Sequence, residues 1–141
     1  MSFLIDTDVL SALRKPARNA ALIAWFERQR SAELFLSVVT IGEIERGIAL
    51  KRTADPAFAE RLAEWLDQLL ALYGERILPF DLRAARRWGM LSAALGNDSV
   101  DLLIAAIALE NGLTVVTRNV RHFKSAGVAA LDPSLPAGRA R

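Results

Sequence analysis

The stretch that decides the fold is FLIDTDVL, residues 3–10, in which a short apolar run ends at an acidic residue. Phe3–Ile5 is aromatic and aliphatic, which is typical of a buried strand. Ligands of open α/β sheets bind beyond the carboxyl ends of the strands, so Asp6 occupies a position usual for a functional acid. Alternatively, Asp6 caps the helix that follows, and Thr7 or Asp8 shares this role. Strand position alone leaves both interpretations open.

Beyond this stretch, apolar strands alternate with helical patterns. We predict further strands at residues 34–36, 77–80, 113–116 and 128–131. Helices are predicted around residues 22–26 and at residues 38–51, 56–72, 82–95 and 99–110. Strands that alternate with helices form a mostly parallel sheet with helices on both faces. The sequence therefore predicts an α/β fold with a central sheet of about five strands.

Length and composition indicate one folded domain and restrict its chemistry. The chain has 141 residues, of which 52% are hydrophobic and 24% charged, as in a globular protein. We expect residues 1–132 to form this domain and residues 133–141, with Pro, Gly and Arg, to form a flexible tail. Cysteine is absent and His122 is the only histidine, which excludes thiolate and multi-histidine metal sites. Any metal must be held by oxygen atoms, which favours Mg²⁺ or Mn²⁺.

The N-terminus and the charge balance bear on location and partners. MSFLIDTDVL has no basic region before a long apolar run, so we expect no signal peptide. No stretch reaches the roughly 20 apolar residues of a membrane span. We therefore expect a cytoplasmic protein without membrane contact, which agrees with the absence of cysteine. The formal net charge of +2 does not by itself indicate a nucleic-acid partner.

A second acid, Glu43, falls within the predicted helix 38–51. Thr40-x-x-Glu43 has the form of a capping box, in which the glutamate returns to the backbone at the start of the helix. The two valines before Thr40 already look helical, however, so we expect the helix to start near Ser37. Glu43 then lies beyond capping reach.

A third acid, Asp101, opens the most apolar helical pattern, SVDLLIAAIALE at residues 99–110. This helix has almost no polar face, so we expect it to be buried, with Asp101 near the carboxyl edge of the sheet. Asp98 is expected to cap the helix rather than bind a ligand. Asp101 could also serve as a cap partner or favour the helix dipole, but a buried acid needs hydrogen-bond donors or a cation. Three acids at one edge would repel each other unless a divalent cation neutralised them.

The last patterned segment is VVTRNVRHF, residues 115–123. Thr117 ends the fourth strand, and we expect a short turn to carry Asn119, Arg121 and His122. Thr and Asn are common at strand exits. At the same sheet edge as Asp6, they could also hydrogen-bond the carboxylates or a metal-bound water.

Four segments, in this order, resemble the PIN-domain family, specifically the VapC-type toxins of bacterial toxin–antitoxin systems. They are FLIDTDVL at residues 3–10, SVVTIGEI at 37–44, DLLIAA at 101–106 and TRNVRHF at 117–123. The resemblance spans nearly the whole chain and implies a three-layer α/β/α fold. It also implies an Mg²⁺- or Mn²⁺-dependent endoribonuclease that acts as a homodimeric toxin. A cognate antitoxin encoded beside it would neutralise it in a heterotetramer or larger complex.

By position, the resemblance implies that Asp6 and Asp101 are metal ligands and that Glu43 is the third catalytic acid. Candidates for supporting the carboxylates or contacting substrate are Thr7, Thr117, Arg118, Asn119 and His122. Many relatives have a fourth aspartate where this chain has His122, which leaves the second metal site open. A neutral His122 would ligate weakly, and a charged one would hold the scissile phosphate. The implied reaction is hydrolysis of RNA by metal-activated water, which leaves 3′-hydroxyl and 5′-phosphate ends.

Two other functions compete with this one. A degenerate PIN-like binding module without catalysis is supported only by His122, and the three retained acids argue against it. An aspartate-phosphorylating phosphatase is suggested by Asp6-Thr7-Asp8 at a strand end. That motif has Thr or Val where this chain has Leu10, and it needs a lysine for which the sequence offers no candidate.

Two surfaces of the expected fold bear on partners. The apolar stripe from Phe58 to Tyr73, which includes Trp65, is expected to be mainly core. Relatives bind an amphipathic antitoxin segment over helices 38–51 and 56–72, so an antitoxin contact stays open there. The cations that could steer an RNA backbone without reading its bases are Arg14, Lys15, Arg118, Arg121 and Lys124.

Overall fold

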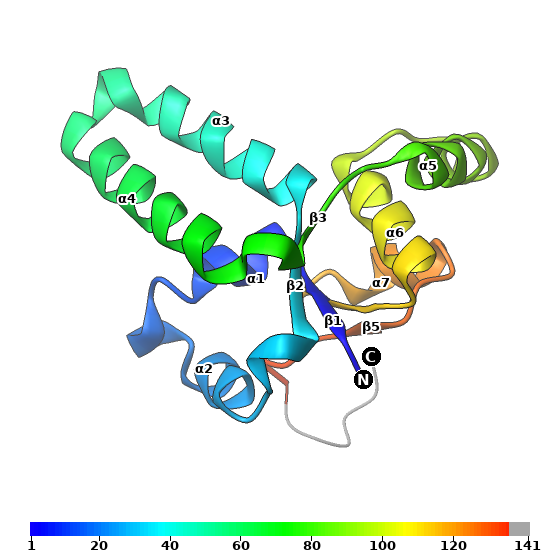
Figure 1. The fold of residues 1–141 in the computed structure, drawn as a ribbon, viewed down its shortest axis with the longest axis horizontal. Coiled ribbons are helices and arrows are strands. Elements are labelled where there is room, and N and C mark those ends of the chain that lie inside the picture. Colours follow the sequence, from blue (N-terminus) through cyan, green and yellow to red (C-terminus); the bar gives the residue numbers. More distant parts are fainter. Residues whose placement is uncertain (136–141) are drawn as a thin grey trace.

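The computed structural model, which describes residues 1–135, contains one parallel sheet. Its strands are β1 (Phe3–Ile5), β2 (Leu34–Ser37), β3 (Ile77–Leu78), β4 (Thr114–Val116) and β5 (Ala130–Leu131). They lie in the order β3-β2-β1-β4-β5, and every pairing is parallel. The predicted five-stranded sheet is confirmed, although β3 and β5 are shorter than expected. β1 is the central strand (Figure 1).

Helices cover both faces of the sheet, which confirms the three-layer architecture (Figure 1). The first group is α1 (Thr7–Ala12), α2 (Ala20–Glu27), α3 (Val38–Ala54) and α4 (Pro56–Tyr73). The second group is α5 (Leu82–Leu95), α6 (Val100–Asn111) and α7 (Val120–Ser125). Short 3₁₀ turns lie at Pro16–Arg18, Ser31–Glu33 and Gly74–Arg76. Figure 1 shows the long α3–α4 hairpin on one side and α5, α6 and α7 on the other.

The helix ends follow the capping chemistry of the sequence. Ser37 caps α3 by accepting a hydrogen bond from the Thr40 backbone N–H at 3.1 Å. Gly96 and Gly112 end α5 and α6 with φ angles of 70° and 65°, a left-handed conformation that glycine adopts without steric cost. The position of Ser37 confirms that Glu43 lies beyond capping reach.

Two local predictions were wrong. Residues 120–125 form helix α7 rather than a turn, because Val120 and Phe123, three positions apart, are both buried on one helical face. Ser99, not Asp98, is the N-cap residue of α6, and Asp98 is exposed one position before it. His122 therefore projects from a helix.

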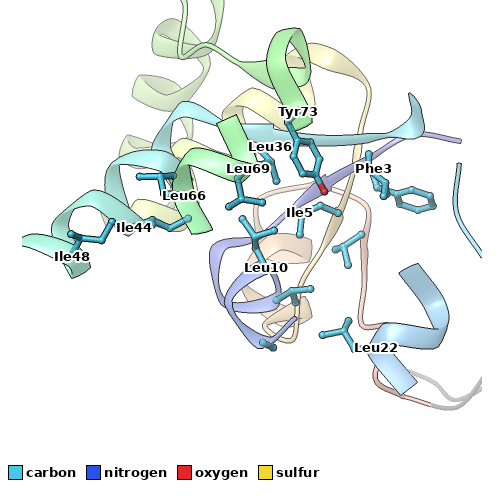
Figure 2. Close-up of a cluster of buried hydrophobic side chains, with 14 of the residues drawn as sticks. Phe3, Ile5, Leu10, Leu22, Leu36, Ile44, Ile48, Leu66, Leu69 and Tyr73 are labelled. Atoms are coloured by element: carbon cyan, nitrogen blue, oxygen red, sulfur yellow. The ribbon is translucent and has the colours of Figure 1, made fainter. Parts of the chain in front are cut away.

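Alternate residues of β1 point to opposite faces and build two cores. Phe3 and Ile5 pack with side chains of α1, α2, α3 and α4 (Figure 2). Leu4 packs on the other face with Val115 and with α5, α6 and α7. α6 has six buried residues, so the expectation of a buried helix is confirmed. These two cores hold the end of β1, and hence Asp6, in a defined position.

The apolar stripe of α4 belongs mainly to the first core, as expected. Leu66, Leu69 and Tyr73 are buried in it (Figure 2). Trp65 is half-buried and packs against this core, and Phe58 is half-buried.

The C-terminal part of the described chain forms a turn after β5. The backbone N–H of Ser134 donates to the Asp132 carboxylate at 2.9 Å. Of the predicted tail 133–141, residues 136–141 lie outside the described residues. None of the helices within residues 1–135 combines the length and apolarity that crossing a bilayer requires.

Candidate active site

The direction of the chain across the sheet reverses at β1. It runs from β1 outward to β2 and β3, and then crosses back to β4 and β5 on the opposite side. In such sheets the ligand crevice opens at this reversal, beyond the carboxyl ends of the flanking strands. Asp6 follows β1 and Thr117 follows β4, so the topology places both residues at the crevice.

Asp6 is a buried carboxylate with two hydrogen-bond donors. Asp6 is only 6% exposed to solvent. The Thr117 hydroxyl donates to Oδ2 at 2.8 Å, and the Thr7 backbone N–H donates to Oδ1 at 2.8 Å. The Thr117 oxygen in turn accepts from the Asn119 backbone N–H at 2.9 Å. Asp6 therefore caps α1, as one interpretation predicted, and also contributes a buried carboxylate to the crevice.

The surroundings of Asp6 disfavour its negative charge. Burial raises the pKa of its carboxyl group from 3.8 to about 6. The hydrogen bond from Thr117 lowers this pKa, and the charge of Asp101 raises it, with a smaller contribution in the same direction from Glu43. A desolvated carboxylate that neighbouring acids also repel is stabilised by a bound cation.

Asp6, Glu43 and Asp101 line one pocket, here called the acid pocket, of about 590 Å³. Thr7, Asp8, Ser11, Arg118 and Asn119 complete its lining. The atoms of this pocket that can bind a metal ion are carboxylate, hydroxyl and amide oxygens, which suit a hard divalent cation. Within residues 1–135, however, no three carboxylate or histidine side chains are grouped closely enough to hold one metal ion together. The structure thus brings the three predicted acids around one cavity without forming a three-ligand cluster.

Glu43 is exposed and is held by a chain of hydroxyl groups. Thr7 Oγ1 lies 2.6 Å from Glu43 Oε1 and 2.8 Å from Thr40 Oγ1. Ser37 Oγ lies 3.3 Å from Thr40 Oγ1. Each hydroxyl carries one proton, so if Thr7 donates to Glu43, Thr40 must donate to Thr7 and Ser37 to Thr40. Thr7 is a predicted site residue, but Ser37 and Thr40 were not predicted, because such residues at a helix start resemble caps.

Asp101 lies in the first turn of α6 beside His122. Its Oδ2 is 3.5 Å from His122 Nδ1, and the Asn119 side-chain amide is 3.3 Å from the same nitrogen. The neutral ring can accept from Asn119 at this nitrogen, whereas the protonated ring can donate to Asp101. The His122 side chain is 64% exposed and lines a neighbouring cavity that shares Asp101 with the acid pocket.

Asp8 and Arg118 form an ion pair on the acid pocket. Arg118 Nη2 and Nε lie 3.0 and 3.1 Å from Asp8 Oδ2 and connect α1 to the segment after β4. Arg118 is a predicted substrate contact, whereas Asp8 was predicted only as a cap. No local pattern signals a pair of residues 110 positions apart.

The model of the PIN-domain family matches residues 3–128, so the chain belongs to this family. The predicted resemblance is thereby confirmed. The plasmid stability protein StbB of Pseudomonas syringae pv. tomato is 35% identical over 136 residues, which cover 92% of this chain and 96% of that protein. The VapC ribonuclease Y4jK of Sinorhizobium fredii is 33% identical over 144 residues, covering 95% and 99%.

A third relative and a similar solved structure come from the same organism. The toxin FitB of Neisseria gonorrhoeae is 33% identical over 136 residues, covering 92% of this chain and 96% of that protein. The crystal structure of FitAcB from the same organism superposes with a TM-score of 0.82 at 33% identity, covering 93% of this chain and 97% of that chain. PIN-domain ribonucleases in general depend on a metal ion, and the oxygen-rich acid pocket suits one.

Proposed function

We propose that this protein is a metal-dependent endoribonuclease and the toxin of a toxin–antitoxin pair. The observation that carries the proposal is the acid pocket, which Asp6, Glu43 and Asp101 line at the reversal point of a PIN-domain sheet. Similarity to a VapC ribonuclease and to the toxin FitB supports the same activity. Membership of the PIN-domain family leaves the aspartate-phosphorylating phosphatase without support.

In this proposal Asp6 and Asp101 hold Mg²⁺ or Mn²⁺, and Glu43 is the third acid. When bound, the cation neutralises charge on the phosphate and makes a water more acidic. Thr117 and Asn119 hold the Asp6 carboxylate in one orientation through their hydrogen bonds. The exposed Glu43 carboxylate accepts a proton from the attacking water, a role that requires a defined direction.

Two further side chains contact the substrate in this proposal. Arg118 borders the acid pocket and presents a permanent positive charge to the phosphate backbone. His122, beside Asp101, adds a second positive charge when it is protonated.

The decisive experiment measures cleavage of total cellular RNA by purified protein and maps the ends that form. Asp6→Asn and Asp101→Asn should each lower the rate by about 100-fold or more, because each removes a metal-binding carboxylate. Asp67→Asn, an exposed acid on α4, is the matched control and should cut normally. EDTA should stop the reaction, and Mg²⁺ or Mn²⁺ should restore it. Undiminished cleavage by both site variants would overturn the proposal.

We further propose that a cognate antitoxin protein neutralises a homodimer of this chain in a heterotetramer or larger complex. The similarity to the FitAcB structure supports an antitoxin partner. For an apolar contact, α4 carries half-buried Phe58 and Trp65 and exposed Leu70 and Leu72. Induced expression should halt growth, and co-expression of the neighbouring gene product should relieve the arrest. Arrest that persists in Asp6→Asn would favour the non-catalytic binding module instead.

A further inference from the structure

A second pocket, lined mainly by cations, adjoins the acid pocket. This cationic pocket of about 470 Å³ is lined by Asp8, Ser11, Ala12, Arg14, Lys15, Arg18, Asn19 and Arg118. Asp8, Ser11 and Arg118 line both cavities. The acid pocket has four carboxylates and one cation, whereas the cationic pocket has four cations and one carboxylate. Two cavities of opposite charge therefore lie side by side along α1.

Most of the positive charge in the cationic pocket is not neutralised by acids. Among residues 1–135, Arg14, Lys15 and Arg18 form no ion pair, whereas Arg118 is paired with Asp8. The Arg14 guanidinium lies 5.4 and 5.2 Å from the ring centroids of Phe58 and Trp65. These aromatic contacts orient the guanidinium but leave its charge intact.

The loop that carries the cations is internally tied. The Asn19 side-chain amide donates to the backbone oxygens of Ala12 and Lys15 at 3.0 and 2.9 Å. Pro16 then starts the 3₁₀ turn that ends at Arg18. Because the backbone is already ordered, less conformational entropy is lost when a polyanion binds these side chains.

We propose that the cationic pocket binds the phosphodiester backbone of the RNA strand next to the cleavage site. The inference rests on the proposed function, which places the scissile phosphate in the acid pocket. The acids of that pocket repel RNA, and the unpaired cations beside it offset this repulsion. Contacts of this kind position the strand without reading its bases. Arg18 and Asn19, which the sequence analysis did not single out, are part of this surface.

Binding is measured by fluorescence anisotropy with a fluorescein-labelled, single-stranded 12-nucleotide RNA of random sequence. EDTA keeps the RNA intact, so the measurement does not depend on cleavage. Lys15→Gln and Arg18→Gln should each raise Kd by about 3- to 10-fold and lower the slope of log Kd against log salt by about 0.7. Arg86→Gln is the matched control, because Arg86 is exposed and lines a separate pocket on α5.

Three results would overturn the proposal. The first is an unchanged Kd in Lys15→Gln and Arg18→Gln, or an equal change in Arg86→Gln. The second is equally tight binding of an oligonucleotide with uncharged methylphosphonate linkages, because the ligand would then not be phosphate. The third is a loss confined to binding of the antitoxin, which would make the pocket a protein contact.

Cleavage in Mg²⁺ or Mn²⁺ is scored separately. Normal cleavage by the wild-type protein, together with unaltered RNA binding in Lys15→Gln and Arg18→Gln, removes only the proposal for the cationic pocket. Absent cleavage by the wild-type protein, together with weakened RNA binding in Arg18→Gln, removes only the proposed nuclease function.

Discussion

The strand end at Asp6 and the first turns of α3 at Glu43 contribute acids to the same pocket by different means. Asp6 is 6% exposed and follows a central strand that is packed on both faces. Glu43 is exposed, and within the described residues its carboxylate accepts one hydrogen bond, from Thr7. Burial and two hydrogen bonds therefore restrain the first carboxylate, whereas one neighbouring hydroxyl restrains the second.

Acids of one site can therefore differ in how much they destabilise the fold. A buried carboxylate destabilises the metal-free protein when it is ionised, and a bound cation relieves that cost. An exposed carboxylate remains hydrated and costs little, but its direction depends on its neighbours. Substitutions at Asp6 should therefore change the stability of the fold as well as the cleavage rate, whereas substitutions around Glu43 should change the cleavage rate alone.

The largest expected effect on stability is that of Asp6→Asn in EDTA. The raised folded-state pKa of about 6, against 3.8 in the unfolded chain, means that wild type loses stability as the pH rises between these values. The variant lacks this loss. The excess of its free energy of unfolding over that of wild type should therefore grow from about pH 4 and reach up to about 3 kcal/mol above pH 6. Urea unfolding of both proteins across this range measures it.

Glu43→Gln is the matched comparison for that measurement. Because Glu43 is exposed, its variant should show no comparable gain at neutral pH. The contrast between the two regions would be contradicted if Glu43→Gln gained as much free energy of unfolding as Asp6→Asn. It would also be contradicted if Asp6→Asn gained none.

The second effect is stabilisation by metal. Mg²⁺ or Mn²⁺ at 100 times its Kd should stabilise wild type by about 2.7 kcal/mol, because the ion binds only the folded chain. Asp6→Asn should lose most of this stabilisation in thermal unfolding experiments with and without metal. An equal rise of the unfolding temperature in both proteins would show that the ion binds away from Asp6.

The third effect concerns the hydroxyl chain. Thr7→Val removes the donor to Glu43 at nearly constant volume, so kcat should fall by about 10-fold with KM unchanged. Thr7→Ser keeps the hydroxyl and should retain most of the activity. If serine and valine behave alike, the methyl group rather than the hydrogen bond is what matters.

The smallest effect is expected at the ion pair of Asp8 and Arg118. The Asp8 side chain is 65% exposed, so Asp8→Asn should change the free energy of unfolding by about 0.5 kcal/mol or less. High salt should abolish even this difference. A loss above about 1.5 kcal/mol in urea unfolding would show that the pair supports the fold.

Much of the fold and part of the site could be predicted, because the signals are local. The run Phe3–Ile5 followed by Asp6 indicated both a buried strand and the place where it ends. The apolar residues of α6 indicated a buried helix with Asp101 in its first turn. The segment after Thr117 was misinterpreted, since the spacing of Val120 and Phe123 over one turn is too short a pattern to distinguish a helix from a turn.

The alternation of strands and helices, most helix ends and the oxygen-rich chemistry could be predicted from the sequence, since periodicity, capping and composition act over a few residues. Only the tertiary structure decided which distant groups meet. It placed β4 beside β1, which brings the Thr117 hydroxyl to Asp6 across 111 positions. It also brought Thr7 to Glu43 and set the cationic pocket beside the acid pocket. These contacts result from the packing of two cores against one sheet, which no local pattern encodes.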